Sequence, residues 1–390
     1  MRKHGFRTPK KKGVYLNDRE RFLATMRFEQ PDRIPYWECA FWGETYQRWL
    51  SEGLPDAVIH PNGPNSGPTE ESLRNYFGFD RSFGVYFRST ISLNLGYIPG
   101  FEHKVISEEN GIITEQGGDG VISRWSRTGH STRQFVRFPV QKRDDFVEIK
   151  KRLDPSNPGR LGNGWKERAL KLQADGAPIC LNVGGYYGFA RSLMGMEGLS
   201  MAFYDQPELV EEIFEYRTEY VGQVIEKVLM EIRPDFAEFW EDMSYKSGSL
   251  VSPVLYRKLA LKHYRRITDL LNKYGVDIVL LDSDGNVDDL IPIWLDGGIT
   301  CIWPLEVASD MDPVSIRRKY GKSLGLIGAI DKRALAKDKK AIEAEVMSKV
   351  PSLIETGGFI PTCDHAVPQD VSLENYLYYL DLIHKIAEGR

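Results

Sequence analysis

The chain has 390 residues, of which 42% are hydrophobic, and its 51 Lys and Arg against 55 Asp and Glu leave a net charge of −4. This balance, without long charged blocks, argues against a nucleic-acid partner, because proteins that bind nucleic acids carry a clustered basic face. No segment approaches about 18 consecutive apolar residues, so we expect no membrane partner. The four cysteines are scattered without a C-x-x-C pair, which is typical of a reducing compartment, and we expect a soluble cytoplasmic protein.

The first residues of the chain are basic. Residues 1–16 are charged and poor in apolar side chains, and no apolar stretch like that of a secretory signal follows them. We expect a loose basic N-terminal arm there. Residues 17–390 are expected to form a single domain, which begins with a capped helix at Asn17.

The rest of the chain falls into two regions. Residues 50–165 are rich in Gly, Pro and Asn and predict long loops with one or two small hairpins. From residue 177 onward, short apolar runs alternate with segments of 3.6-residue periodicity, which is typical of βα units. The predicted strands are 34–37, 85–88, 178–183, 236–240, 277–281, 300–303, 324–328 and 358–361, and the predicted helices are about 207–232, 253–274, 287–296, 312–320, 332–356 and 372–388. Eight strands predict an α/β fold closed into a (β/α)8 TIM-type barrel, with an open doubly wound sheet as the alternative.

Carboxylates follow five successive predicted strands. They are Glu241 with Asp242, Asp282 with Asp284, Glu306, Asp331, and Asp364 beside His365. Loops at the carboxyl ends of barrel strands form the active site, so these residues are the first candidates. Like charges repel strongly in a low-dielectric cleft, and a bound divalent cation would neutralise them. Oxygen ligands with one imidazole suit Zn²⁺, Mn²⁺, Fe²⁺ or Mg²⁺.

Each candidate also has a structural interpretation. An acid just past a strand is often the N-cap of the next helix, and Asp284 or Asn286 could cap the helix at 287. Asp282 and Asp284, two residues apart at a strand end, point to the same side and favour a shared site. His365 could be a satisfied core histidine, and Cys363 is expected to be a small buried residue rather than a nucleophile.

Three motifs resemble the uroporphyrinogen decarboxylase superfamily, and the resemblance extends over about residues 17–388. Arg33-Ile34-Pro35-Tyr36-Trp37 is similar to the family's R-x-P-V-W strand, Gly328-Ala329-Ile330-Asp331-Lys332 to its G-N-[LI]-D-P turn, and His365-Ala366-Val367-Pro368 with Glu374-Asn375 to its closing H-G-I-x-P and E-N. The resemblance implies a distorted (β/α)8 barrel in one domain.

Two positions separate the chain from true uroporphyrinogen decarboxylases. That branch has two arginines after the first Trp that hold the carboxylates of its substrate, and the resemblance places Ala40 and Glu44 there. A tetrapyrrole with many carboxylates would meet a cavity that is itself negatively charged. We therefore do not expect uroporphyrinogen decarboxylation.

A second branch, the zinc-dependent corrinoid-linked methyltransferases, resembles the chain more closely. The similarity includes Glu241-Asp242 followed by Leu250-Val251-Ser252-Pro253. That branch has H-x-C at a strand end, an acid further along and a Cys in the last strand-to-helix loop. Asp282-x-Asp284, Glu306 and His365 fall at these positions. The resemblance implies that the site is retained while its ligands change from sulfur to oxygen and nitrogen.

The leading hypothesis is a metal-dependent methyltransferase that moves a methyl group between a small O- or N-methyl substrate and a corrinoid protein. Asp282 and/or Asp284, Glu306 and His365 would bind the metal, with zinc expected. Glu241 and Asp242 would orient ligands or pass a proton. The chain contains no D-x-H-x-x-G corrinoid motif, so a partner would supply the cobalamin.

Two other functions remain open. A lyase or decarboxylase acting on a small carboxylic acid would hold the carboxylate with Lys332 or an arginine and would turn over without a corrinoid. A catalytically silent small-molecule-binding barrel would show no turnover, with or without a corrinoid protein. The clustered carboxylates argue against it, because a site that has lost its function should not keep charges that repel one another. Apolar surface helices would support a homodimer.

Overall fold

The computed structural model describes residues 15–88, 90–126 and 133–389. All but the last two residues of the predicted N-terminal arm, 1–16, lie outside this part. The chain divides into two compact units. Unit 1 comprises Met1–Thr90, Ala169–Cys180 and Thr300–Arg390, and unit 2 comprises Ile91–Arg168 and Leu181–Ile299. That residues 17–390 form one domain stays a prediction.

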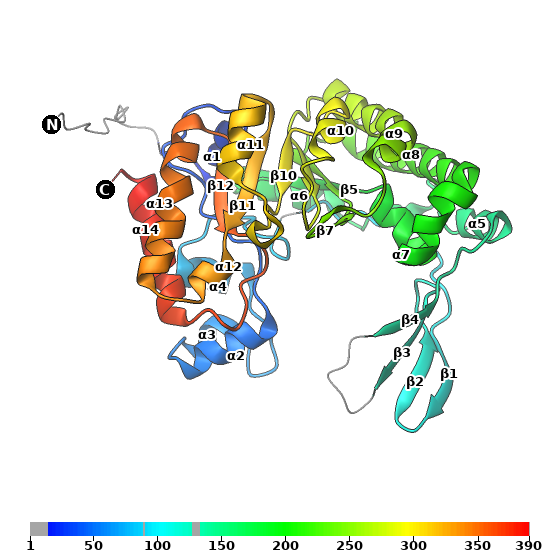
Figure 1. Ribbon diagram of the computed structural model, residues 1–390, viewed down its shortest axis with the longest axis horizontal. Coiled ribbons are helices and arrows are strands. Elements are labelled where there is room, and N and C mark those ends of the chain that lie inside the picture. Colours follow the sequence, from blue (N-terminus) through cyan, green and yellow to red (C-terminus); the bar gives the residue numbers. More distant parts are fainter. Residues whose placement is uncertain (1–14, 89, 127–132, 390) are drawn as a thin grey trace. The chain divides into compact units, whose positions relative to one another are not determined.

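Unit 1 contains three adjacent parallel strands with helices between them in sequence (Figure 1). The strands are β10 (Cys301–Trp303), β11 (Gly325–Ile330) and β12 (Phe359–Cys363), with β11 in the middle. The helices are α1 (Asp18–Met26), α2 (Gly43–Ser51), α3 (Asp56–Ile59), α4 (Glu70–Phe77), α11 (Pro313–Tyr320), α12 (Lys332–Leu335), α13 (Lys339–Thr356) and α14 (Leu373–Ala387), with 3₁₀ turns at η2 (Val307–Ser309) and η3 (Gly321–Ser323). Helix α6 (Trp165–Ala174) has residues in both units.

The first helix begins where the sequence predicts. Asn17 Oδ1 accepts a hydrogen bond from the Glu20 backbone N–H at 2.9 Å, and Glu20 Oε2 accepts one from the Asn17 N–H at 3.0 Å. This reciprocal capping box satisfies two backbone donors that the first turn of a helix leaves unpaired.

Unit 2 contains a second set of adjacent strands, β5 (Cys180–Gly184), β6 (Phe236–Trp240) and β9 (Val279–Asp282), in the order β9-β6-β5. β6 and β9 are parallel, with Trp240 opposite Asp282. The helices of this unit are α5 (Arg143–Lys150), α7 (Tyr187–Asp205), α8 (Pro207–Leu229), α9 (Pro253–Lys273) and α10 (Ile291–Asp296), with a 3₁₀ turn at η1 (Pro158–Arg160). β7 (Ser244–Tyr245) and β8 (Gly248–Ser249) form a short antiparallel hairpin after β6.

The hairpins predicted between residues 50 and 165 are confirmed. β1 (Lys104–Glu109), β2 (Ile112–Gln116), β3 (Ile122–Ser126) and β4 (Gln134–Arg137) form a four-stranded antiparallel sheet in sequence order. In Figure 1 this sheet stands apart from the parallel strands of its unit.

Six of the eight predicted parallel strands are confirmed. The prediction is wrong for 34–37 and 85–88, which do not form regular strands. The first is extended chain that ends in one parallel bridge from Phe41 to Val367. Carboxylates accept its backbone N–H groups: Tyr36 N donates to Asp80 Oδ2 at 3.1 Å and Cys39 N to Glu38 Oε1 at 2.8 Å. Side chains therefore satisfy donors that a strand ladder would otherwise use.

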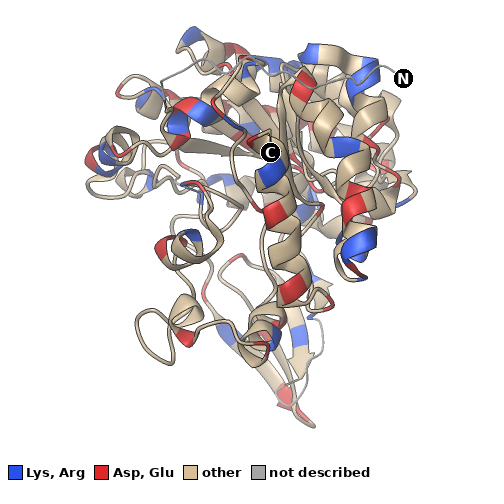
Figure 2. Cartoon of the chain, turned by 90° about the vertical axis from the view of Figure 1, so that its left-hand side faces the viewer, with Lys and Arg blue, Asp and Glu red and all other residues tan. Residues whose placement is uncertain are grey.

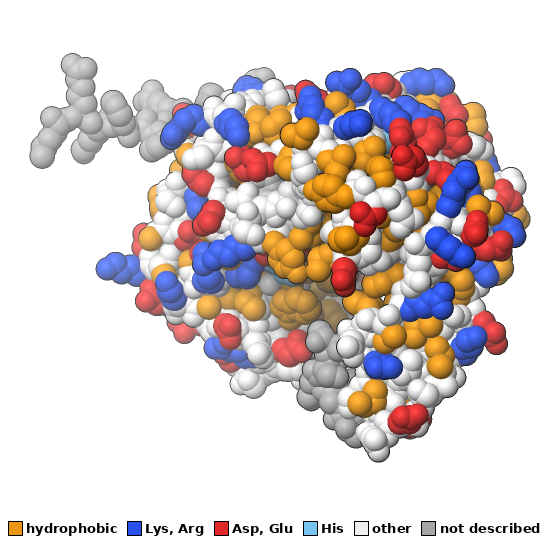
Figure 3. All heavy atoms as spheres, turned by 45° about the vertical axis from the view of Figure 1, so that its right-hand side comes forward, with side chains coloured by type: hydrophobic (Ala, Val, Ile, Leu, Met, Phe, Trp, Pro, Cys, Tyr) orange, Lys and Arg blue, Asp and Glu red, His pale blue; other side chains and the backbone are white. Residues whose placement is uncertain are grey.

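Charges of both signs are interspersed over the surface. Acidic and basic segments are interspersed along the helices in Figure 2. Lys339 pairs with Glu374, and Lys385 pairs with Asp381. Apolar side chains reach the surface between them on the face in Figure 3. The predicted homodimer stays a prediction. Among the described residues, no helix is both long and apolar enough to cross a membrane.

Candidate functional site at the strand ends

The predicted acids lie at or just beyond the carboxyl ends of parallel strands. Glu241, Asp242, Asp282 and Asp284 follow or end strands of unit 2, whereas Glu306, Asp331, Asp364 and His365 follow strands of unit 1. The prediction of their place in the fold is therefore confirmed for every one of them.

Lys332 links two acids of unit 1. Its Nζ lies 3.3 Å from Glu306 Oε1 and 3.4 Å from Asp364 Oδ1. The buried Asp364 carboxylate also accepts the backbone N–H groups of Val307 at 2.9 Å and Lys332 at 3.2 Å. Burial raises the pKa of Asp364, and the ammonium of Lys332 opposes that rise. Lys332 thus neutralises part of the negative charge for which the sequence analysis proposed a bound metal.

Asp331, the acid after β11, has a structural role. Its side chain accepts the Arg333 backbone N–H at 2.8 Å and pairs with the Arg333 guanidinium. It is the N-cap of the short helix α12. For this acid the capping interpretation is the right one.

A buried acid that sequence reasoning missed lies in the extended segment before α2. Glu38 Oε1 accepts the backbone N–H groups of Cys39 and Cys363, both at 2.8 Å, and Oε2 accepts the Tyr376 hydroxyl at 2.8 Å. Burial raises the pKa of Glu38 to about 7. The signal was present as a lone acid in the apolar run from Ile34 to Phe41.

The aromatic and sulfur residues near these strand ends differ in exposure. His365 stacks on the half-exposed Trp42, with ring centroids 6.0 Å apart. Trp37 is buried against Phe22 and belongs to the core. Cys363 is fully buried, as predicted, and burial raises the pKa of its thiol.

In unit 2, Glu241 is fully buried and holds the turn that precedes α7. Its carboxylate accepts the backbone N–H groups of Tyr186 at 2.9 Å and Gly188 at 3.0 Å, and the Tyr264 hydroxyl. A Cβ at Gly185 would lie 2.0 Å from the Trp240 carbonyl oxygen, so the close approach of the two segments requires glycine. Burial raises the pKa of Glu241. This geometry favours a positioning role over direct contact with a substrate.

Asp242 is neutralised by an arginine of α7. Its Oδ2 lies 2.7 Å from Arg191 Nη2, and its carbonyl oxygen accepts from Nη1 at 3.0 Å. The Arg191 guanidinium also lies over the Trp240 ring, 5.1 Å from its centroid. Asp242 itself has a φ of 47°, in the left-handed region.

Asp282 and Asp284 lie on a turn that is fixed to the β7–β8 hairpin. Ser283 Oγ accepts the Met243 backbone N–H at 3.1 Å, and Asn286 N donates to the Tyr245 carbonyl at 2.9 Å. Both aspartates are half-buried. The backbone around them is therefore held by neighbours other than the two carboxylates themselves.

The proposed metal set is distributed over both units, with Asp282 and Asp284 in unit 2 and Glu306 and His365 in unit 1. Within the described residues, no three His, Cys, Asp or Glu side chains are grouped so as to hold a metal ion. The donor chemistry suits a hard cation, but the metal site stays a prediction, and we derive no catalytic step through a metal.

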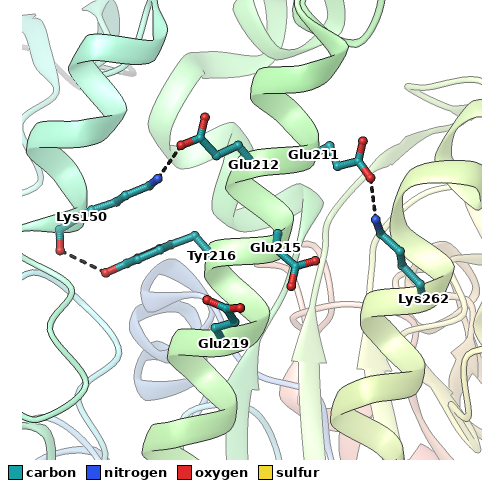
Figure 4. Close-up of a pocket in the computed structure, with 7 residues that line it drawn as sticks. All are labelled: Lys150, Glu211, Glu212, Glu215, Tyr216, Glu219 and Lys262. Carbon is teal, nitrogen blue, oxygen red and sulfur yellow. Dashed lines mark hydrogen bonds and ion pairs between the residues drawn. The ribbon is translucent and has the colours of Figure 1, made fainter.

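A surface groove away from the strand ends is also acidic. It encloses about 340 Å³ and is lined by Lys150, Glu211, Glu212, Glu215, Tyr216, Glu219 and Lys262 of α5, α8 and α9 (Figure 4). Lys150 pairs with Glu212 and Lys262 with Glu211, each at 2.5 Å. The paired charges indicate a helix-helix contact rather than a site.

Comparison with known proteins places the chain in a family. A solved methyltransferase from Methanosarcina mazei has the same fold, with a TM-score of 0.59 and 15% identity over 95% of this chain and 99% of that chain. This match and the alternating strands confirm the predicted distorted TIM-type α/β fold. No curated protein matches the sequence. The family model described as uroporphyrinogen decarboxylase (URO-D) matches residues 139–386, more than half of the chain. The chain therefore belongs to the uroporphyrinogen decarboxylase (URO-D) family.

Proposed function

We propose that the protein is a methyltransferase that moves a methyl group between a small O- or N-methyl substrate and a corrinoid protein. The observation that carries the proposal is that a buried Ala40 and an exposed Glu44 lie where the resemblance to true decarboxylases implies two arginines. The fold shared with a methyltransferase over nearly its whole length supports the same choice.

The surroundings of Lys332 argue against this lysine as the residue that holds the carboxylate in the alternative lyase. A residue that holds a substrate carboxylate needs an uncommitted positive charge. The Lys332 ammonium is already balanced by the carboxylates of Glu306 and Asp364. A substrate acid would have to compete with both of them.

In the proposed reaction the chain's own residues bind and orient the substrate. Arg191 holds Asp242 at the end of β6, and the hairpin after β6 fixes the turn that carries Asp282 and Asp284. Transfer of the methyl group as a cation leaves an alkoxide or a deprotonated amine, which takes up one proton from solvent, and the Asp242 carboxylate would orient that group or the water that protonates it. A bound divalent metal, zinc in our proposal, would act as a Lewis acid toward that heteroatom.

The first test is methyl transfer in solution. We expect the purified protein to transfer methyl groups from members of a panel of O- and N-methyl compounds to reduced cob(I)alamin, which yields methylcobalamin and the demethylated compound. The change in cobalamin absorbance measures the rate. Substrate conversion without any corrinoid, or release of carbon dioxide, would replace the proposal with the lyase.

The metal is tested separately by elemental analysis of the purified protein. We expect about one divalent ion per chain, lost in Asp284→Ala and in His365→Ala, because each removes a proposed ligand. Asp288→Ala, an exposed acid four residues after Asp284, is the matched control and should retain the ion. If the native protein binds no metal even after reconstitution, the metal part of the proposal fails, and cobalamin methylation still decides the methyl transfer.

A further inference from the structure

Arg217 of α8 is a buried charged side chain. Its side chain is only 5% exposed, and neither Nε nor Nη1 has a hydrogen-bond partner within the described part of the chain. No carboxylate there forms an ion pair with it. The hydroxyl of Tyr220, three residues along the same helix and also buried, has no partner among the described residues either. Residues three apart on a helix lie on one face, so three unsatisfied polar atoms are gathered there.

Such an arrangement is costly unless something pairs with it. A buried charge that lacks a partner costs several kcal/mol, and nearly all buried polar atoms in proteins have partners. Burial accordingly lowers the pKa of Arg217. The three unsatisfied atoms therefore point to a partner outside the described residues.

Arg160, an equally buried arginine of the same unit, is different. Its Nε donates to the Asp154 carbonyl at 2.9 Å, Nη2 donates to the Arg152 carbonyl at 2.8 Å, and Nη1 donates to two further backbone carbonyls. All three nitrogens thus stabilise local backbone, and Arg160 is structural. Burial of an arginine in this fold does not by itself leave its donors unsatisfied.

The guanidinium of Arg217 lies at the carboxyl end of β5. A Cβ at Gly184, the last residue of that strand, would lie 2.0 Å from Arg217 Nη2, so the guanidinium packs directly against the end of the strand. Ligands of parallel α/β folds bind at the carboxyl ends of strands. Phe189 lies against the guanidinium plane, with its centroid 4.5 Å away.

We propose that Arg217 and Tyr220 bind the carboxylate of a small organic acid at the end of β5. A planar carboxylate accepts two parallel hydrogen bonds from a guanidinium, and both bidentate edges of an arginine include Nη2. One guanidinium balances one negative charge, and the flanking rings of Phe189 and Tyr220 suit an organic body better than they suit a phosphate dianion. That this acid is the methyl substrate rests on the proposed function, whereas the binding does not.

The test measures binding without turnover, by titration calorimetry and thermal unfolding with sodium benzoate, sodium acetate, neutral benzamide and inorganic phosphate. We expect benzoate to bind and raise the melting temperature, and benzamide to do neither. Arg217→Met should weaken benzoate binding on the order of 10- to 100-fold, because it removes charge-assisted hydrogen bonds. Arg217→Lys keeps the positive charge but cannot donate two parallel hydrogen bonds, and Tyr220→Phe removes one donor. Both should therefore weaken benzoate binding less than Arg217→Met does.

The control is Arg266→Met, which removes an arginine paired with Glu215 at the surface of α9 and should leave benzoate binding unchanged. Arg217→Met should keep the wild-type circular dichroism, because among the described residues it breaks no ion pair. Equal benzoate binding by wild type and Arg217→Met, preference for phosphate, or no anion binding by the wild type would each overturn the proposal. So would a failure of both Arg217→Met and Arg217→Lys to fold, which would make Arg217 structural.

Discussion

Replacing Lys332 with methionine is expected to lower the free energy of unfolding by about 3 kcal/mol at neutral pH, because it leaves the buried carboxylate of Asp364 without its counter-ion. The ammonium lies 3.4 Å from that carboxylate and 3.3 Å from Glu306. Methionine keeps most of the aliphatic chain, so the loss is electrostatic and not a packing effect. Urea unfolding followed by circular dichroism measures it.

The loss should shrink as the pH falls. Without Lys332, the pKa of Asp364, which burial already raises, rises further, and a protonated carboxyl group needs no counter-ion. For the same reason Asp364→Asn should recover part of the stability when added to Lys332→Met. Lys337→Met, at an exposed lysine just beyond α12, is the control and should change stability by less than about 0.5 kcal/mol. Equal effects of the two lysine variants would contradict the prediction.

The βα part of the fold was predictable because its signal is local. Each of the six confirmed strands is an apolar run followed by a helix with its own periodicity, as in 236–240 before α9. The segment 34–37 has the same apolar character, but the backbone N–H of Tyr36 donates to the Asp80 carboxylate, and that of Cys39, two residues after the segment, donates to Glu38. The contact with Asp80 joins residues far apart in the sequence, and periodicity does not report such contacts.

The site was predictable in position but not in its pairing. Strand ends locate the acids, because the carboxyl ends of parallel strands carry the functional loops. Which acid is neutralised depends on distant residues, such as Arg191 for Asp242 and Lys332 for Asp364. Arg217 is harder to recognise from the sequence. It is a charged residue on the otherwise apolar face of α8 that includes Ile213 and Val224. A buried arginine can be inferred from that spacing, but its lack of a partner cannot.

Glu38→Gln is expected to remove a pH dependence of stability worth about 3 kcal/mol. The pKa of Glu38 rises from 4.5 to about 7 on folding, chiefly through burial. Between these values the folded state keeps a proton that the unfolded state has lost, so the wild-type protein loses stability as the pH rises from about 4.5 to about 7. Above that range the loss is complete, and a shift of this size corresponds to about 3 kcal/mol.

Glutamine fits the same place without titrating. Its carbonyl oxygen can accept the backbone N–H groups of Cys39 and Cys363, and its amide can donate to the hydroxyl of Tyr376. Other groups that titrate in this range are present in both proteins and cancel in the difference. The stability of Glu38→Gln relative to wild type should therefore rise by about 2.5 kcal/mol between about pH 5 and pH 8, measured by urea unfolding. Glu44→Gln, at an exposed acid of α2, should show no such rise. A flat difference for Glu38→Gln would mean that Glu38 is ionised in the folded protein at pH 5, and that its three hydrogen bonds outweigh its burial.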